Sequence, residues 1–157
     1  FGGNQNRARR IHGPISGDPG VIVFDTDVIS YVLRPSPPTG LIRKVAELDP
    51  EEQATTAITA GELTYGAWKS SKPDHFISAL DQRVWPNVRV LGFDLSSALI
   101  YGRLRAKLEQ QGTPVAEPDL RIAAICLRHD ATLATGNIRH FARVPKLRAE
   151  DWLAEFR

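Results

Sequence analysis

Apolar and polar positions alternate in blocks along the chain, so that short strand-like runs are separated by longer helical patterns. Residues 21–24 form a continuous apolar run, and comparable runs occur at 54–58, 88–91 and 131–134. Runs of this kind are typical of strands that are buried on both faces of a parallel sheet. Because these runs alternate with helical segments, the pattern predicts a layered α/β fold.

Three of the intervening segments have clear helical spacing. Residues 41–48 form one, and a longer helix begins after Asp94 as its N-cap and ends at Gly112. Residues 119–128 follow Pro118 and are apolar on nearly every side, which predicts a deeply packed helix. Right-handed crossovers would bring the loops that follow the strands to one edge of the sheet, where open α/β sheets build their sites.

Composition places the chain among ordinary globular proteins. Its 157 residues suit one domain, and 42% hydrophobic with 24% charged residues gives no sign of a fibrous or disordered protein. Residues 1–20 differ, because glycine, proline and arginine replace bulky apolar residues there. We expect this segment to be a flexible N-terminal extension, with a processing remnant as one interpretation, and residues 21–157 to be the domain.

Charge and cysteine content limit the partners and the cellular compartment that the sequence predicts. The formal net charge is only +2, so a polyanionic partner must be held by a local basic patch. The single cysteine, Cys126, lies in an apolar helical segment and cannot form an internal disulfide, which fits a reducing cytoplasm. No apolar run approaches the roughly 18 residues of a membrane span, so we expect a cytoplasmic protein without a membrane role.

Three carboxylates stand where the pattern places strand ends and helix starts. Asp25 ends the first strand, Glu62 follows the second, and Asp119 opens the buried helix. If they converge, two of their charges about 4 Å apart repel by roughly 4 kcal/mol at an effective dielectric near 20. A cation would relieve this repulsion, and carboxylates without histidine or cysteine favour Mg²⁺ or Mn²⁺. Such ions polarise phosphodiesters and activate water.

Each acid also has a structural interpretation. Glu62 completes the sequence Thr59-Ala-Gly-Glu62, a capping box in which Thr59 caps a helix and the glutamate bonds back to its backbone. Asp119 is favourable in a first helical turn because of the helix dipole. Asp25 is harder to explain structurally, because a carboxylate directly after a buried strand has a costly desolvation.

Four further segments follow one another in a fixed order. They are Val23-Phe-Asp-Thr-Asp-Val-Ile-Ser30, the stretch from Thr59 to Ala67, the stretch from Gly112 to Ala124, and Thr132-Leu-Ala-Thr-Gly-Asn-Ile-Arg-His-Phe141. In this order they resemble the motifs of the PIN-domain VapC toxins. The similarity extends over about residues 21–153. It implies a PIN-domain fold, in which helices flank a central parallel sheet of four to five strands.

The same resemblance implies an activity and partners. The expected protein is the toxin of a type II toxin–antitoxin system, a homodimeric endoribonuclease that depends on Mg²⁺ or Mn²⁺ and acts at an acidic cleft. Its expected partners are the RNA substrate and a cognate VapB-type antitoxin whose C-terminal segment enters the cleft. By position, Asp25, Glu62 and Asp119 match the three principal acids of the family.

Two positions depart from the family pattern. Asp27 stands where asparagine is commoner, and Asn137 stands near where many relatives place a fourth acid. A second metal would then be held more weakly, unless Glu117 or Asp27 compensates. We therefore predict one firm metal site, with Asp27, Glu117 and Asn137 as candidate additional ligands.

Candidate substrate contacts lie in the last third of the chain. Thr135 and Asn137 could bind the water shell of the metal or a phosphate, although Thr135-Gly-Asn137 also suits a plain turn. Arg139 and His140 follow directly and are the best placed to bind phosphates. The other basic residues here, for which a solvated surface position is the default, are Arg121, Arg128, Arg143, Lys146 and Arg148.

Two other functions fit parts of the sequence. Asp25-Thr-Asp27-Val after an apolar strand also matches the opening motif of haloacid-dehalogenase-type phosphatases, in which Asp25 would be the nucleophile and Asp27 an acid/base. That scheme has no place for Glu62. The other alternative is a non-catalytic PIN module that binds nucleic acid or a partner protein.

Overall fold

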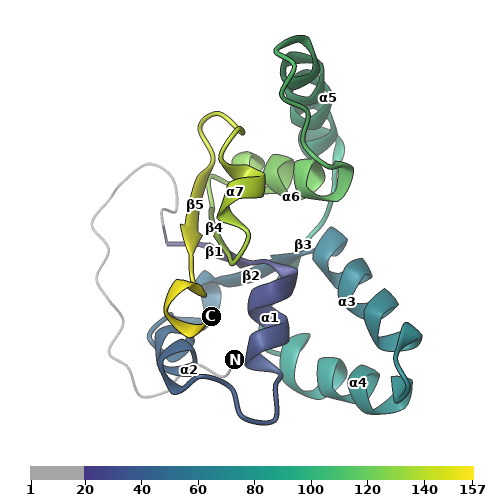
Figure 1. Ribbon diagram of the computed structural model, residues 1–157, viewed down its shortest axis with the longest axis vertical. Helices are drawn as coiled ribbons and strands as arrows, with labels where there is room; N and C mark the ends of the chain where they lie inside the picture. The colour runs from purple at the N-terminus through teal and green to yellow at the C-terminus, as the bar shows by residue number, and fades with distance from the viewer. Residues whose placement is uncertain (1–19) are drawn as a thin grey trace.

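The computed structural model describes residues 20–157 and contains one five-stranded parallel sheet in the order β3-β2-β1-β4-β5 (Figure 1). The strands are β1 (Ile22–Phe24), β2 (Gln53–Thr56), β3 (Arg89–Leu91), β4 (Thr132–Thr135) and β5 (Arg148–Asp151). The α/β fold and the four predicted strands are confirmed. The predicted N-terminal extension lies outside the described residues, apart from Gly20.

Strand β5 is the one that the apolar pattern does not reveal. Its sequence, Arg148-Ala-Glu-Asp151, pairs in parallel with β4 but alternates between exposed and half-buried positions. It lies at the edge of the sheet, where only one neighbouring strand covers it. An edge strand does not need the continuous apolar run that burial on both faces imposes.

The described helices connect and flank these strands. They are α1 (Thr26–Val32), α2 (Thr39–Ala46), α3 (Ala57–Lys69), α4 (Pro73–Ala79), α5 (Leu95–Gln110), α6 (Glu117–Arg128) and α7 (Ile138–Phe141). Short 3₁₀ turns occupy Pro50–Glu52 and Ala154–Phe156, and a π-helical turn, Leu80–Val84, follows α4. The three predicted helices correspond to α2, α5 and α6. Asp94 caps α5 as expected, with its Oδ1 accepting from the Ser97 amide at 2.8 Å.

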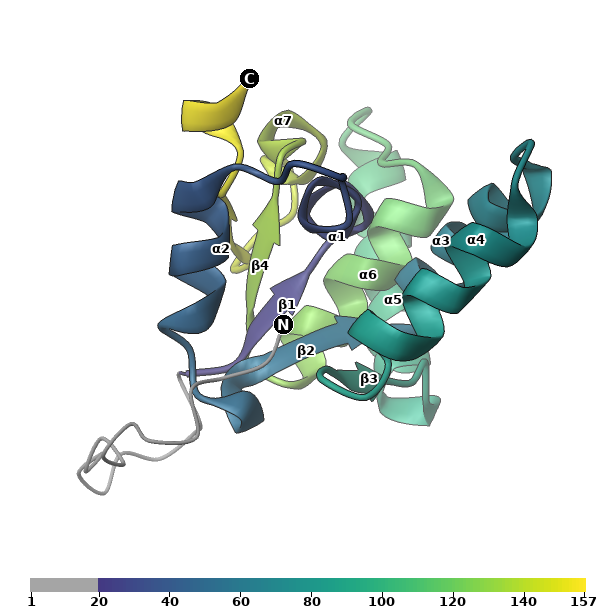
Figure 2. The same ribbon diagram turned by 90° about the horizontal axis from the view of Figure 1, so that it is seen from below.

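Two apolar clusters cover the two faces of the sheet. Successive residues of a strand point to opposite faces of the sheet and so join different clusters. Val23 and Leu133 belong to the cluster under α5 and α6, whereas Phe24 and Ala134 belong to the cluster under α1 to α4. Figure 2 shows α2 and α6 on opposite sides of the sheet. Cys126 is fully buried in α6, as predicted. Within residues 20–157 no helix combines the length and the apolar character of a membrane span.

The topology changes direction between β1 and β4. From β1 the chain builds β2 and β3 on one side, and then it returns to add β4 and β5 on the other side. The segments that follow β1 and β4 therefore diverge from a crevice at the carboxyl edge of the sheet. Open α/β sheets bind their ligands at such a switch point.

Candidate active site

Asp25 lies at the switch point as the N-cap of α1, and its residue is 6% exposed. One carboxylate oxygen accepts from the Thr26 amide at 2.8 Å, and the other accepts from the Thr135 hydroxyl at 2.7 Å. Within residues 20–157, no Lys, Arg or His pairs with Asp25. Its negative charge is thus held by two hydrogen bonds and has no counter-charge.

Glu62 is not part of a capping box, so that structural interpretation is wrong. Helix α3 begins at Ala57, and its cap is Thr56, whose hydroxyl oxygen accepts from the Thr59 amide at 3.0 Å. Glu62 consequently stands beyond the first turn, where no free backbone amide is left for it to cap. Its side chain faces the crevice instead.

Asp119 lies in the first turn of α6, where the helix dipole favours a carboxylate. Its Oδ2 is 3.2 Å from Nδ1 of His140, and its side chain is 22% exposed. The imidazole of His140 is 60% exposed, so this pair stands at the mouth of the crevice. The structure therefore brings a predicted substrate-binding residue into contact with a predicted metal ligand.

One pocket of about 370 Å³ joins the three acids. It is lined by Asp25, Thr26, Asp27, Ser30, Tyr31, Arg34, Glu62, Asp119 and Asn137. We call it the acidic pocket. Its acids come from the starts of α1 and α6 and from the body of α3, segments that are far apart in the sequence.

The electrostatic state of the pocket reflects this gathering of like charges. Burial raises the pKa of Asp25 to about 6, hydrogen bonds from Thr135 and Thr26 oppose the rise, and the charges of Asp27 and Asp119 add to it. The pKa of Glu62 is raised by burial and then by the charges of Asp25 and Asp119. The charge of Asp119 thus makes both Asp25 and Glu62 harder to ionise, an effect that a cation in the pocket would relieve.

The donor set suits a hard divalent cation. Within residues 20–157 no group of three or more Asp, Glu, His or Cys side chains lies close enough together to coordinate a metal ion directly. Mg²⁺ does not require this, because it keeps several of its waters and is bound through one or two carboxylates. Oxygen ligands on a buried acid without a counter-charge therefore fit the ion that the sequence predicts.

Asp27 lines the pocket, but hydrogen bonds within the protein occupy its carboxylate. Oδ1 accepts from the Val28 amide at 2.8 Å, and Oδ2 accepts from the Gly136 amide at 2.8 Å and from Nδ2 of Asn137 at 3.1 Å. A Cβ at Gly136 would stand 2.6 Å from Asp27 Oδ2 and 2.6 Å from a methyl of Leu153. Glycine at 136 thus allows Asp27 to bind the loop after β4.

Thr135 is fully buried at the end of β4. Its hydroxyl donates to Asp25 and accepts from the Asn137 amide at 3.0 Å. Both functions of the hydroxyl are therefore used inside the protein. This placement supports an action through Asp25 rather than a direct contact with substrate.

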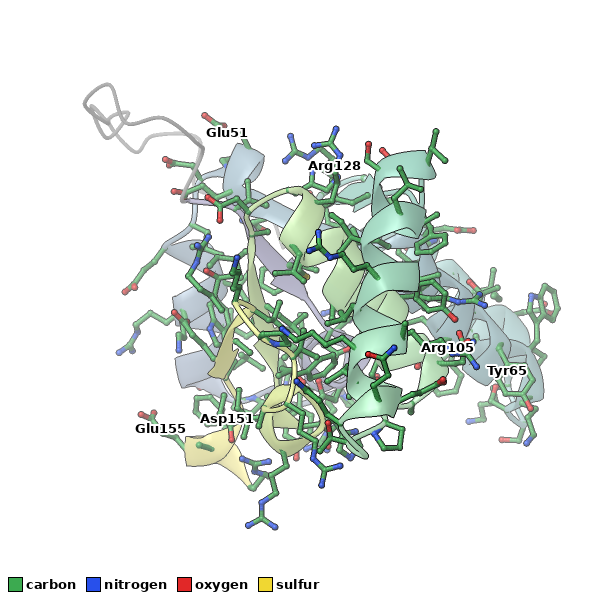
Figure 3. All side chains as sticks on the ribbon, turned by 90° about the horizontal axis from the view of Figure 1, so that it is seen from above. Glu51, Tyr65, Arg105, Arg128, Asp151 and Glu155 are labelled. Carbon is green, nitrogen blue, oxygen red and sulfur yellow. The ribbon has the colours of Figure 1, made fainter. Side chains whose placement is uncertain are left out.

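Glu117, a candidate additional ligand in the sequence, does not line the acidic pocket. Its carboxylate accepts from the Tyr101 hydroxyl, from Arg105 at 2.6 Å and from Arg121 at 3.0 Å. It lines a separate pocket, which has Glu62 in common with the acidic pocket. Figure 3 shows Arg105, which anchors this network on α5, on the opposite side of the molecule from Asp151 at the end of β5.

Sequence reasoning missed several residues that line the acidic pocket, namely Ser30, Tyr31 and Arg34. They belong to α1 and the turn that follows it, a helix not predicted from the pattern. The signal was present, because Asp25 is a favourable N-cap residue and Val28, Ile29 and Val32 have helical spacing. The helix was missed because it has only seven residues and directly follows the apolar run of β1, so its own spacing is hard to distinguish.

Comparison with known proteins agrees with this fold. The chain belongs to the PIN domain family, whose pattern it matches over residues 22–147. It is 32% identical over 130 residues to the tRNA(fMet)-specific endonuclease VapC of Salmonella typhimurium, a match that covers 83% of this chain and 96% of the relative.

Solved structures show the same likeness. The crystal structure of VapBC2 from Rickettsia felis bound to a DNA fragment from its promoter has a chain that aligns with a TM-score of 0.77 at 31% identity, covering 84% of this chain and 98% of that one. FitAcB from Neisseria gonorrhoeae aligns with a TM-score of 0.77 at 29% identity, over 85% of this chain and 99% of that one.

Proposed function

We propose that this chain is a metal-dependent endoribonuclease, the VapC-type toxin of a toxin–antitoxin pair. The observation that carries the proposal is the convergence of Asp25, Glu62 and Asp119 on one pocket. Among the described residues, 20–157, no Lys, Arg or His forms an ion pair with Asp25 or Glu62. The VapC relative in Salmonella typhimurium, which is named an endonuclease specific for tRNA(fMet), supports RNA as the substrate class.

Asp25, Glu62 and Asp119 would hold the ion, Mg²⁺ or Mn²⁺. When bound, such an ion polarises a phosphodiester and lowers the pKa of a water that attacks it. The hydrogen bonds from Thr135 and Thr26 favour the ionised form of Asp25 and fix its orientation. Asp119 is oriented by the start of α6 and by its contact with His140.

One firm metal site remains our expectation. Glu117 is bound by two arginines outside the pocket, and Asp27 is bound by the loop after β4. Asn137 lines the pocket, and because its Nδ2 donates to Asp27, its side-chain oxygen is the atom that can meet a ligand. Neither predicted substitute for a fourth acid is therefore free to hold a second ion.

The test is cleavage of RNA by the purified protein in Mg²⁺, in Mn²⁺ and in EDTA, with sequencing of the cleaved ends. Asp119→Ala is expected to lose cleavage in both metals. Glu117→Ala is the matched control, because it removes a carboxylate from the same helical turn without altering the acidic pocket. Equal cleavage in EDTA, or full activity of Asp119→Ala, would contradict the proposal, and RNA binding without cleavage would favour a non-catalytic PIN module.

The haloacid-dehalogenase alternative loses support in this structure. That chemistry needs Asp27 to exchange a proton with the substrate, whereas both of its oxygens accept hydrogen bonds from residues of the chain. It also leaves Glu62 in the pocket without a role. Hydrolysis of small phosphomonoesters with an acyl phosphate on Asp25 would restore this alternative.

The proposed partner is a VapB-type antitoxin, since the Rickettsia felis structure that aligns with this chain is that of a VapBC complex. A mainly apolar pocket, lined in part by Leu33, Leu63, Phe76 and Leu80, shares Arg34 and several other residues with the acidic pocket. A single C-terminal segment of the antitoxin could fill both. Cognate antitoxin is expected to abolish cleavage, and homodimerisation stays a prediction that sedimentation can measure.

A further inference from the structure

Several arginines of this protein differ in whether a carboxylate of the chain pairs with them. Arg105, Arg121, Arg148 and Arg157 each form an ion pair with a carboxylate. Arg34, Arg139 and Arg143 have no ion-pair partner within residues 20–157, although all three line pockets that contain acids of the candidate site. Their charges remain available to an external anion.

Arg34 stands at one end of the acidic pocket, just after α1. Its guanidinium carbon lies 3.4 Å from the centre of the Tyr31 ring, a stacking that restricts the side chain without neutralising its charge. It comes close enough to line the same pocket as Asp25 and Glu62, yet it forms no ion pair with either. A restricted, unpaired guanidinium of this kind is suited to hold a phosphate.

Arg139 and Arg143 stand on the other side of the acids. With His140 they line a pocket of about 270 Å³ that is also lined by Asp119 and by residues 114–116. Asp119 borders this pocket and the acidic pocket alike. In Figure 1 the end of α1 and helix α7 lie on opposite sides of the point where α1 begins.

We propose that Arg34 on one side and Arg139 with Arg143 on the other hold the phosphates that flank the bond to be cleaved, so that a single RNA strand crosses the acidic pocket. This inference rests on the proposed function and adds to it two residues, Arg34 and Arg143, that bind substrate. A strand held on both sides must continue in both directions. The arrangement therefore selects internal bonds of single-stranded or loop RNA.

The test is the salt dependence of RNA binding by the full chain in EDTA, which separates binding from cleavage. A fluorescein-labelled single-stranded RNA is titrated with wild type, Arg34→Ala and Arg143→Ala at several salt concentrations, and the affinity is read from fluorescence anisotropy. Each lost phosphate contact should make the slope of log K against log salt shallower by about 0.7. The double variant should lose about twice that, and Arg34→Lys and Arg143→Lys should restore most of the slope.

Arg128→Ala is the matched control. It removes the same charge from an exposed position in the last turn of α6, at the end opposite to Asp119, and Figure 3 shows it far from Asp151. Its slope should equal that of the wild type. Thermal unfolding of each variant should match the wild type as well, since Arg34 and Arg143 are exposed.

Unchanged slopes for Arg34→Ala and Arg143→Ala would overturn the inference, and so would equal losses in Arg128→Ala or no measurable binding by the wild type. A protein that cleaves RNA in Mg²⁺ but shows unchanged slopes would leave the proposed function standing without this substrate path. If the slopes change as expected but the protein never cleaves RNA, the substrate path is supported and the proposed function is contradicted.

Discussion

Glu117 and Asp119 stand two residues apart in the first turn of α6, yet their surroundings are opposite. Glu117 accepts from Tyr101 and from two arginines, and the hydrogen bond from Tyr101 is the main reason that its pKa is lowered. Asp119 faces a pocket in which Asp25 and Glu62 carry charges of the same sign, and burial raises the pKa of Asp25 to about 6.

The contrast shows how to distinguish a structural acid from a functional one. The chain supplies the counter-charges of Glu117 itself, so that carboxylate fastens α6 to α5. Asp25 is held in place without a counter-charge, so the folded protein carries a cost that a bound cation would remove.

The largest effect is expected for Asp25→Asn, which keeps the shape of the side chain and removes its charge. Metal-dependent RNA cleavage should fall by more than about 100-fold, because even residues that only support a metal ligand contribute about 10- to 100-fold. Initial rates at saturating Mg²⁺ measure this. Glu117→Gln, the same kind of change in the paired acid, should retain cleavage close to the wild-type rate.

Thr135→Val should have the next largest effect, a loss of about 10- to 100-fold in cleavage. The hydroxyl of Thr135 lowers the pKa of Asp25, so its removal raises that pKa further. The acid limb of the pH–rate profile should therefore move to higher pH. Thr135→Ser retains the hydroxyl and should keep both the rate and the profile, whereas an unchanged limb in Thr135→Val would contradict a positioning role.

In EDTA, a rise in pH should lower the free energy of unfolding, whereas the same rise increases activity along the acid limb. The pKa of Asp25 rises from 3.8 to about 6 on folding, so the unfolded chain loses this proton first as pH rises. The contribution of Asp25 to stability should thus decline between about pH 4 and 6 and stay low above that, by about 3 kcal/mol in all. Denaturant unfolding should show this decline.

Asp25→Asn should remove most of that pH dependence and raise the free energy of unfolding at pH 7 in EDTA. The hydroxyl of Thr135 can rotate to accept from the new amide, so the hydrogen bond need not be lost. Added Mg²⁺ should stabilise the wild type and leave Asp25→Asn unchanged. A variant less stable than the wild type at pH 7 would show that the carboxylate of Asp25 stabilises the folded protein even without a metal ion.

The smallest effect is expected for Glu117→Gln on stability. The carboxylate and its arginine partners are largely exposed, so the ion pairs are screened by solvent. Thermal unfolding should show a small decrease in melting temperature that diminishes at high salt. A large loss of stability or of cleavage would mean that this network positions Asp119.

Much of the fold follows from local patterns in the amino-acid sequence. A continuous apolar run marks β1, and a short run of small and apolar residues without charge marks β4, because both strands are covered on both faces. Asp94 caps α5 through a hydrogen bond three residues away, and Gly112, at a φ of +69°, ends it. These features depend on neighbours in the sequence, so they can be read from it directly.

The candidate acids could also be named from the sequence, but their surroundings could not. Glu117 and Asp119 look alike in a helical turn, and only the packing of α5 gives arginine partners to one of them. The cap of α3 is Thr56 rather than Thr59, because the partner strands determine where β2 ends. Thr135 meets Asp25 across 110 residues of sequence. Contacts at such separations depend on the order of strands in the sheet, which no local pattern encodes.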